Sequence, residues 1–164
     1  MNADAFRHFY NYHLAENRKI WDTCITRLTL EQFTQDSGYS HGSVREQIVH
    51  LMSVDEVWFC ELRGVEPSEP LPPADFDDRE SIRAQWDRVE QGMRTYLAEL
   101  GDDLLFDKPI KEPEEDQNLS VWQVLLHVAN HGTDHRAQLL RQLNDLGVKT
   151  EAQDYIFYVN EHPL

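Results

Sequence analysis

Apolar residues recur every three or four positions along most of the chain, which is the spacing of amphipathic helices that bury one face. This pattern predicts five helices, over about residues 3–28, 43–63, 79–100, 120–146 and 152–160. The four long helices predict an all-α fold, a four-helix bundle, and the short C-terminal helix is expected to pack across it. We expect a single domain over residues 1–164, because a chain of this length buries one core.

Local signals at the predicted helix starts and in one connection support these boundaries. Ser43 with Glu46, and Ser120 with Gln123, have the spacing of capping boxes, in which two side chains satisfy unpaired amides at a helix start. The segment 66–78 contains four prolines and five acidic residues. Such a segment can neither continue a helix nor form a central strand, so we predict a surface loop there.

Charge and composition narrow the classes of partner. The chain has 15 Lys and Arg residues against 30 Asp and Glu residues, a formal net charge of −15, which repels polyanions and predicts no nucleic-acid partner. No apolar run reaches the roughly 20 residues of a membrane span, and the start lacks the apolar core of a signal peptide. We therefore expect no membrane partner and a cytoplasmic location. Cys24 and Cys60 lie in apolar helical patterns and are expected to be buried free thiols.

The histidines are the main candidates for chemistry. His127, His131 and His135 recur every fourth residue, and a helical projection places His135 nearest the apolar face and His127 farthest from it. Side chains four residues apart can bind one metal ion, so His131 and His135 form a candidate pair. His50, in the middle of another amphipathic helix, is the best-placed third ligand. The sequence predicts a three-histidine metal site with an open coordination position, as in catalytic zinc sites.

Neighbouring residues have alternative interpretations. His127 is a hydrogen-bonding neighbour of the ligands, an interface residue or a surface group. Asp55, about one helical turn beyond His50, is a candidate partner for the free N–H of a ligand, against the alternative of a capped or solvated acid. Arg136 is a candidate anchor for an anionic substrate, although a surface ion pair is the favoured alternative. The histidines expected to have no role at the metal are His8, His13, His41 and His162.

Several familiar catalytic motifs are missing from the sequence. Gly132 stands where HExxH metalloproteases carry a glutamate base, and the Glu-x-x-His pairs of di-iron bundles are absent. The chain also lacks the G-x-S-x-G, Walker and G-x-G-x-x-G motifs. A mononuclear histidine site therefore remains as the candidate chemistry.

Two segments resemble the DinB/YfiT-like superfamily of metalloenzymes, within a similarity that extends over the whole chain. SVREQIVHLMSVDEVWFCELRG is similar to the second helix of that family, and SVWQVLLHVANHGTDHRAQLLRQLNDLG is similar to its HxxxHxxxHR helix. The resemblance places the metal-binding histidines of the family at His50, His131 and His135. One departure is Ala137, which stands where the family commonly has glycine.

The resemblance also implies a topology, a cofactor and an activity. It implies an up-down-down-up bundle, a divalent metal ion that is most often zinc or nickel, and a homodimer. Characterised members of the family use the metal to activate a low-molecular-weight thiol, so the first hypothesis is a metal-dependent enzyme of the S-transfer or isomerisation type. The alternatives are a non-catalytic, stress-related homodimer with a structural metal and a metal-free helical interaction module. Four aromatic residues belong either to a dimer face or to the core: Phe6, Tyr10, Trp21 and Trp122.

Overall fold

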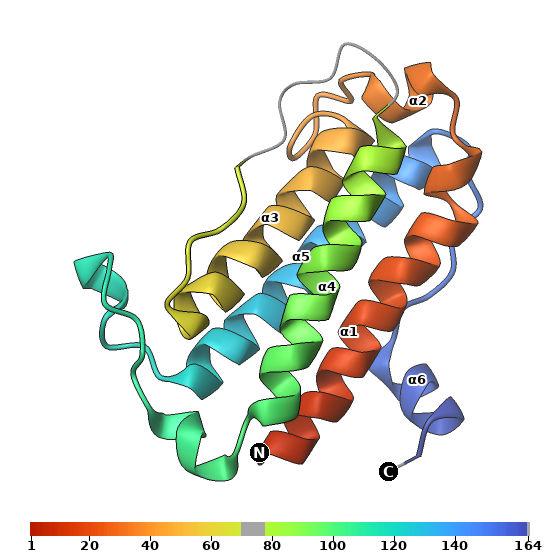
Figure 1. The fold of residues 1–164 in the computed structure, drawn as a ribbon. Coiled ribbons are helices and arrows are strands. Elements are labelled where there is room, and N and C mark those ends of the chain that lie inside the picture. Colours follow the sequence, from red (N-terminus) through yellow and green to blue (C-terminus); the bar gives the residue numbers. More distant parts are fainter. Residues whose placement is uncertain (70–77, 164) are drawn as a thin grey trace.

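A computed structural model describes residues 1–69 and 78–163, and within these ranges it contains helices and no β-strand. The long helices are α1 (Ala3–Thr23), α3 (Val44–Arg63), α4 (Arg79–Glu99) and α5 (Val121–Asp145). In Figure 1, α1 and α5 run in one direction and α3 and α4 in the other. The predicted all-α fold and its up-down-down-up order are confirmed.

The core lies where the four apolar helix faces meet. Helix α3 packs against α4 and α5, and α1 packs against the same two helices from the other side. Tyr10, Ile48, Met93 and Leu125, one from each helix, are at most 1% exposed. Phe6 and Trp21 are also buried, so these two and Tyr10 belong to the core, and the alternative of a dimer face is wrong for them. Trp122 is partly buried against the same core.

The end of the first predicted helix differs from the structure. Helix α1 ends at Thr23, and the chain continues through a 3₁₀ turn, Ile25–Arg27, and a short helix α2, Leu30–Thr34. Ile25 and Leu28 remain buried in the core. The apolar spacing therefore continues after the α-helical geometry has stopped, which is why the pattern alone extended the helix too far.

The predicted capping signals are present at α3 and α5. The Glu46 amide donates to Ser43 Oγ at 3.1 Å, and the Ser43 amide donates to the Glu46 carboxylate at 2.9 Å. At α5, the Ser120 amide donates to Gln123 Oε1 at 2.9 Å. Gly64, with φ +64°, ends α3 in the left-handed conformation that a side chain would disfavour.

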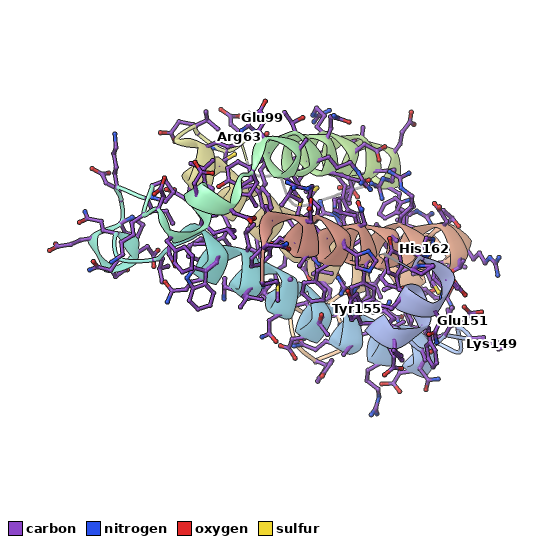
Figure 2. The ribbon with its side chains drawn as sticks, turned by 90° about the horizontal axis from the view of Figure 1, so that it is seen from below. Arg63, Glu99, Lys149, Glu151, Tyr155 and His162 are labelled. Carbon is purple, nitrogen blue, oxygen red and sulfur yellow. The ribbon has the colours of Figure 1, made fainter. Side chains whose placement is uncertain are left out.

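The connections and the C-terminal helix complete the fold. Two 3₁₀ turns, Asp102–Phe106 and Glu114–Asp116, lie between α4 and α5, and α6 spans Tyr155–Glu161. Figure 2 shows α6 on the side of α1 away from α4. The ring of Tyr155 packs edge-on against Phe9 and Tyr12, so the predicted terminal helix docks on α1.

Three expectations about the rest of the chain have different outcomes. The predicted surface loop over 66–78 falls mostly on residues 70–77, outside the described residues. Cys24 and Cys60 are free and buried, as predicted. None of the helices described here combines the length and the apolar character needed to cross a membrane.

Candidate metal centre

Four imidazole rings meet between α3, α5 and the loop that precedes α3. The ring centre of His50 lies 5.0 Å from that of His131 and 4.5 Å from that of His135. The rings of His131 and His135, one turn apart on α5, are 4.1 Å apart. The three histidines predicted from the sequence are therefore brought together by the antiparallel packing of α3 on α5. Their role as metal ligands stays a prediction.

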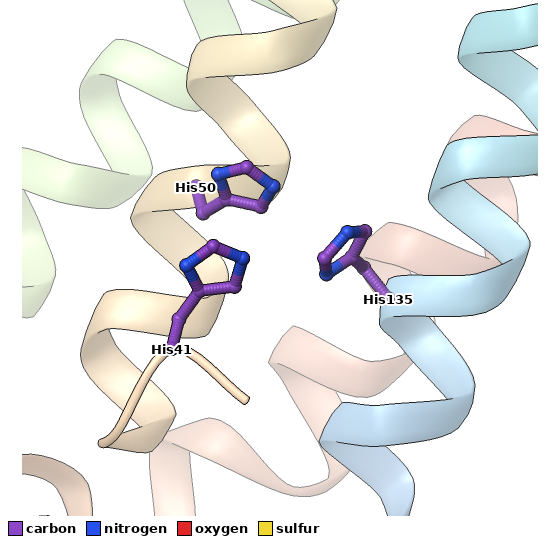
Figure 3. Close-up of side chains that lie close together, drawn as sticks. All are labelled: His41, His50 and His135. Carbon is purple, nitrogen blue, oxygen red and sulfur yellow. The ribbon is translucent and has the colours of Figure 1, made fainter. Parts of the chain in front are cut away.

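The fourth ring belongs to His41, which the sequence analysis placed among the ordinary polar histidines. It stacks on His50 with ring centres 3.8 Å apart, and Figure 3 shows both rings facing His135 from α3 and its preceding loop. One ring nitrogen from each of His41, His50 and His135 lies within 4.8 Å of the others, close enough to hold a metal ion. The structure thus contains two overlapping sets of three histidines, which share His50 and His135.

The surroundings of His50, His131 and His135 favour the neutral forms of these three rings. Burial, followed by the neighbouring rings of His41 and His135, lowers the pKa of His50 to about 4. Burial and then His135 lower the pKa of His131 to about 4, against a smaller raising effect of Asp55. The pKa of His135 is also lowered, mainly by burial. Neutral imidazoles have the free lone pairs that a metal ion requires.

The distances between nitrogens fit a shared ion. Nε2 of His50 and Nε2 of His131 are 3.1 Å apart. Two imidazoles that each bind one ion at about 2.0–2.1 Å can have their nitrogens at such a separation. Nδ1 of His131 is buried and has no hydrogen-bond partner in the described part of the chain. All-nitrogen donor sets of this kind accept zinc, nickel and other first-row divalent ions.

Gln47 fixes the orientation of the His135 ring. Its side chain is fully buried on α3, one turn before His50. The amide nitrogen lies 2.7 Å from His135 Nδ1 and donates at 3.2 Å to the His135 carbonyl oxygen. For His135 to offer Nε2 to a metal, Nδ1 must carry the proton, and a half-turn of the amide then presents the Gln47 oxygen to it.

A second buried histidine, His13 on α1, has hydrogen-bond partners at both ring nitrogens. Arg136 Nη1 donates to His13 Nδ1 at 3.0 Å, so in the neutral ring Nε2 carries the proton. Nε2 of His13 donates to Asp55 Oδ2 at 3.2 Å. Arg136 also donates to Asn17 Oδ1 at 3.1 Å. His13, Asp55 and Arg136 are at most 1% exposed, and together with Asn17 they form what we call the buried network.

Gly132 makes the close packing of this network possible. A Cβ atom at this position would lie 2.3 Å from His13 Cε1 and 3.1 Å from Arg136 Nη1. The ring of His13 therefore rests against the backbone of α5, in space that any side chain at position 132 would fill. The glycine that excluded an HExxH protease in the sequence has a packing role here.

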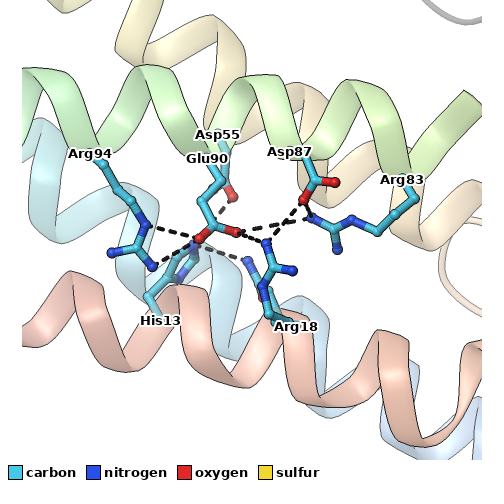
Figure 4. A network of polar contacts seen from close by, with 8 residues as sticks. His13, Arg18, Asp55, Arg83, Asp87, Glu90 and Arg94 are labelled. Atoms are coloured by element: carbon cyan, nitrogen blue, oxygen red, sulfur yellow. Dashed lines mark hydrogen bonds and ion pairs between the residues drawn. The ribbon is translucent and has the colours of Figure 1, made fainter.

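Ion pairs hold α1 beside α4 near the buried network. Arg18 Nη2 lies 3.0 Å from Asp87 Oδ1 and 3.1 Å from Glu90 Oε2, which joins the two helices. Arg83 and Arg94 extend the chain of charges along α4 (Figure 4). Single exposed pairs contribute little to stability, whereas a connected set such as this one restrains the position of α1.

Comparison with known sequences assigns the family. The sequence model of the DinB family matches residues 1–162. Protein DinB of Bacillus subtilis (strain 168) is 24% identical over 166 residues, which cover 97% of this chain and 95% of that protein. The chain belongs to the DinB family. The predicted family resemblance is confirmed, and the three predicted histidines of the cluster lie on the two segments that carried it.

Three residues singled out in the sequence now have defined positions. His127 is exposed and packs edge-on against Trp58, with ring centres 5.1 Å apart, so its role beside the ligands stays a prediction. The expected surface ion pair of Arg136 is wrong, because this side chain is fully buried among hydrogen-bond partners. Its role as a substrate anchor stays a prediction. Ala137, which departs from the common family glycine, is exposed on α5.

A shallow pocket gives access to one side of the histidine cluster. It has a volume of about 530 Å³ along α5, and His127, His131 and Asp134 are among its lining residues. A larger pocket of about 790 Å³ lies between α1, α5 and the segment that leads into α6, and none of the four clustered histidines lines it. The smaller pocket is the relevant one for chemistry, because it contains a candidate ligand.

Proposed function

We propose that this DinB family protein is a metal-dependent enzyme that acts on a small thiol, with His50, His131 and His135 as the metal ligands. The observation that carries the proposal is the 3.1 Å approach of two neutral Nε2 atoms from different helices, beside a third imidazole. A bound zinc or nickel ion would lower the pKa of a coordinated thiol and so supply a thiolate nucleophile near neutral pH.

The protein side chains contribute orientation and charge. His50 and the two α5 histidines offer neutral nitrogens from rigid helices, so little entropy is lost on binding the ion. The pocket beside His131 is open on its outer side and leaves room for a small substrate. We propose that the enzyme works as a homodimer in the cytoplasm, without nucleic-acid or membrane partners.

Asp55 supports the proposal as a positioning residue for His131. Asp55 Oδ1 and His131 Nδ1 are both buried, and neither has a hydrogen-bond partner in the described residues. The two groups are close enough for the Asp55 charge to raise the pKa of His131. We propose that the carboxylate accepts the Nδ1 proton, directly or through one water molecule, and so leaves Nε2 for the metal.

The first experiment is elemental analysis of the protein purified without a histidine tag. We expect about one divalent ion per chain, and we expect His50→Ala to lose it while His162→Ala, at an exposed position directly after α6, retains it. An unchanged metal content in His50→Ala would show that the site is wrong. A metal-free wild-type protein that binds no added zinc or nickel would favour the interaction module.

The second experiment tests the chemistry. A panel of low-molecular-weight thiols with a soluble electrophile is measured with the metal-loaded and the metal-free protein. Thiol-dependent turnover that requires the metal supports the enzyme. Full metal content without turnover, together with a stable dimer, would support the structural-metal alternative. Asp55→Asn is expected to lower metal affinity by about 10–100-fold, the usual effect of losing an outer partner of a ligand.

A further inference from the structure

We propose that His41 is a fourth metal donor, carried by a loop, and that it is the donor an incoming thiolate replaces. The inference rests on the proposed function and adds a residue to its site. His41 stacks on His50 at 3.8 Å between ring centres, and its ring centre lies 5.2 Å from that of His135. One ring nitrogen from each of these three residues lies within 4.8 Å of the other two.

The loop that carries His41 is held in place by α5. Gln142 Nε2 donates to the carbonyl oxygens of Tyr39 and Gly42, at 3.3 and 3.1 Å. Ser37 and Gly42 are joined by a backbone hydrogen bond of 3.0 Å, which closes the loop. These hydrogen bonds fix the position of the loop, and in that position the ring of His41 lies against the ring of His50.

Ser40 connects the same loop to His135. Its hydroxyl lies 2.9 Å from Gln47 Oε1 and also contacts Gln138 Oε1. The single hydroxyl proton of Ser40 can be donated to only one of these two oxygens. With the Gln47 amide turned by a half-turn, its N–H donates to Ser40 Oγ, the Ser40 hydroxyl donates to Gln138, and the Gln47 oxygen accepts the Nδ1 proton of His135. This arrangement frees His135 for a metal and keeps the loop contact, and it gives up the hydrogen bond from Gln47 to the His135 carbonyl oxygen.

The four donors differ in how easily they can leave. His50, His131 and His135 are half-buried on long helices, whereas His41 is exposed on a loop. Releasing His41 moves a short surface segment, and releasing any of the others disturbs a helix. In such an exchange, the thiol would give its proton to solvent, its sulfur would take the place of the His41 nitrogen, and the released imidazole would turn outward.

The test uses cobalt(II) as a visible probe. Metal-free wild type, His41→Ala, His41→Gln and the control His162→Ala are titrated with cobalt(II), and zinc affinity is measured by competition with a chelator. We expect an intense four-coordinate spectrum for the wild type and the control. In both His41 variants we expect a weaker spectrum and a loss of zinc affinity of at least about tenfold, since even outer partners of ligands contribute that much.

Two added ligands sharpen the result. Imidazole added to His41→Ala should restore the wild-type spectrum, because it fills the position that the side chain left. 2-Mercaptoethanol should bind the cobalt form of His41→Ala more tightly than that of the wild type, because no histidine has to be displaced. A spectrum, zinc affinity and thiol affinity equal to those of the wild type would overturn the role of His41 and leave the three helix histidines in place. A wild-type chain that binds no cobalt would overturn both proposals.

Discussion

The two sides of helix α5 carry histidine sites of opposite character. On the side that faces α3, His131 and His135 meet His50 and His41, and these rings contact mainly one another. On the side that faces α1, His13 has a protein partner at each nitrogen, Arg136 at one and Asp55 at the other. The first arrangement leaves nitrogen lone pairs for a ligand, whereas the second uses its polar atoms within the fold.

One helix therefore supports both a candidate site and its scaffold. Most polar atoms of the buried network have hydrogen-bond partners. Any movement that breaks these bonds leaves a buried polar group without a partner, so the network resists rearrangement. A cluster of neutral imidazoles gains little from its own contacts. We infer that the network fixes α5 relative to α1 and α3, and that the cluster is free to bind.

The largest effect is expected from Arg136→Met. The variant leaves the buried Asp55 carboxylate without its compensating charge, which should lower the free energy of unfolding by about 3–5 kcal/mol. Urea unfolding of the metal-free protein measures the change. Arg141→Met, which removes an exposed arginine paired with Asp145 on the same helix, is the control and should unfold like the wild type. A loss below about 1 kcal/mol, the range of surface pairs, would contradict a structural role for Arg136.

Gly132→Ala should come next, because its methyl group overlaps the His13 ring in the buried network. We expect a loss of about 1–3 kcal/mol in unfolding free energy, the usual cost of overpacking a core. Gly92→Ala on α4 is the matched control, where the nearest atom is the flexible end of Arg63 at 3.3 Å. There we expect a gain of about 0.5–1 kcal/mol, since alanine favours a helix over glycine. Equal responses at both glycines would show that His13 does not need the open space.

Variants of Gln47 test how much the orientation of the His135 ring contributes to metal binding. Gln47→Leu removes the partner of His135 Nδ1, so zinc affinity should fall by about 10–100-fold while the protein stays folded. Gln47→Glu keeps an acceptor at that position and should bind zinc at least as tightly as the wild type. Chelator competition measures both. A leucine variant with wild-type affinity would show that Gln47 has no part in orienting the ligand.

A separate test is the pH dependence of the stability of the metal-free protein. His50 and His131 have folded pKa values of about 4, below the value of about 6.5 expected for an unfolded histidine. The unfolded chain therefore binds more protons between these values, so their contribution to stability is lost as pH falls from about 6.5 to 4. Thermal unfolding at several pH values should show a shallower decline in His50→Asn than in the wild type. Parallel curves would contradict the lowered pKa of His50.

Particular residues show how far the sequence could predict this molecule. The periodic apolar residues gave the four long helices, and Ser43 with Glu46 marked the start of α3. The spacing of His131 and His135 indicated a shared face, and His50 was the inward histidine of another helix. All three rings do meet. The helix pattern failed after Thr23, because Ile25 and Leu28 keep the apolar spacing in a backbone that is no longer α-helical.

The surroundings of His41 and His13 could not be predicted, for a different reason. Neither has a sequence neighbour that marks it, since His41 lies in a loop and His13 lies on a helix far from the other histidines in sequence. One weak signal was present for His41: its loop directly precedes the helix of His50, so in the bundle it lies near the end of α5 that carries His135. The partners of His13 lie 42 and 123 residues away in sequence.

Residue spacing along the chain accounts for the helices, the helical bundle and the face that holds the two α5 histidines, because these follow from interactions between residues three or four positions apart. Helix packing, in contrast, brings His41 into the cluster and buries Arg136 together with His13. Those outcomes depend on which helices pack side by side and on how closely a glycine lets them approach. Such contacts between distant segments leave no periodic trace in a single chain.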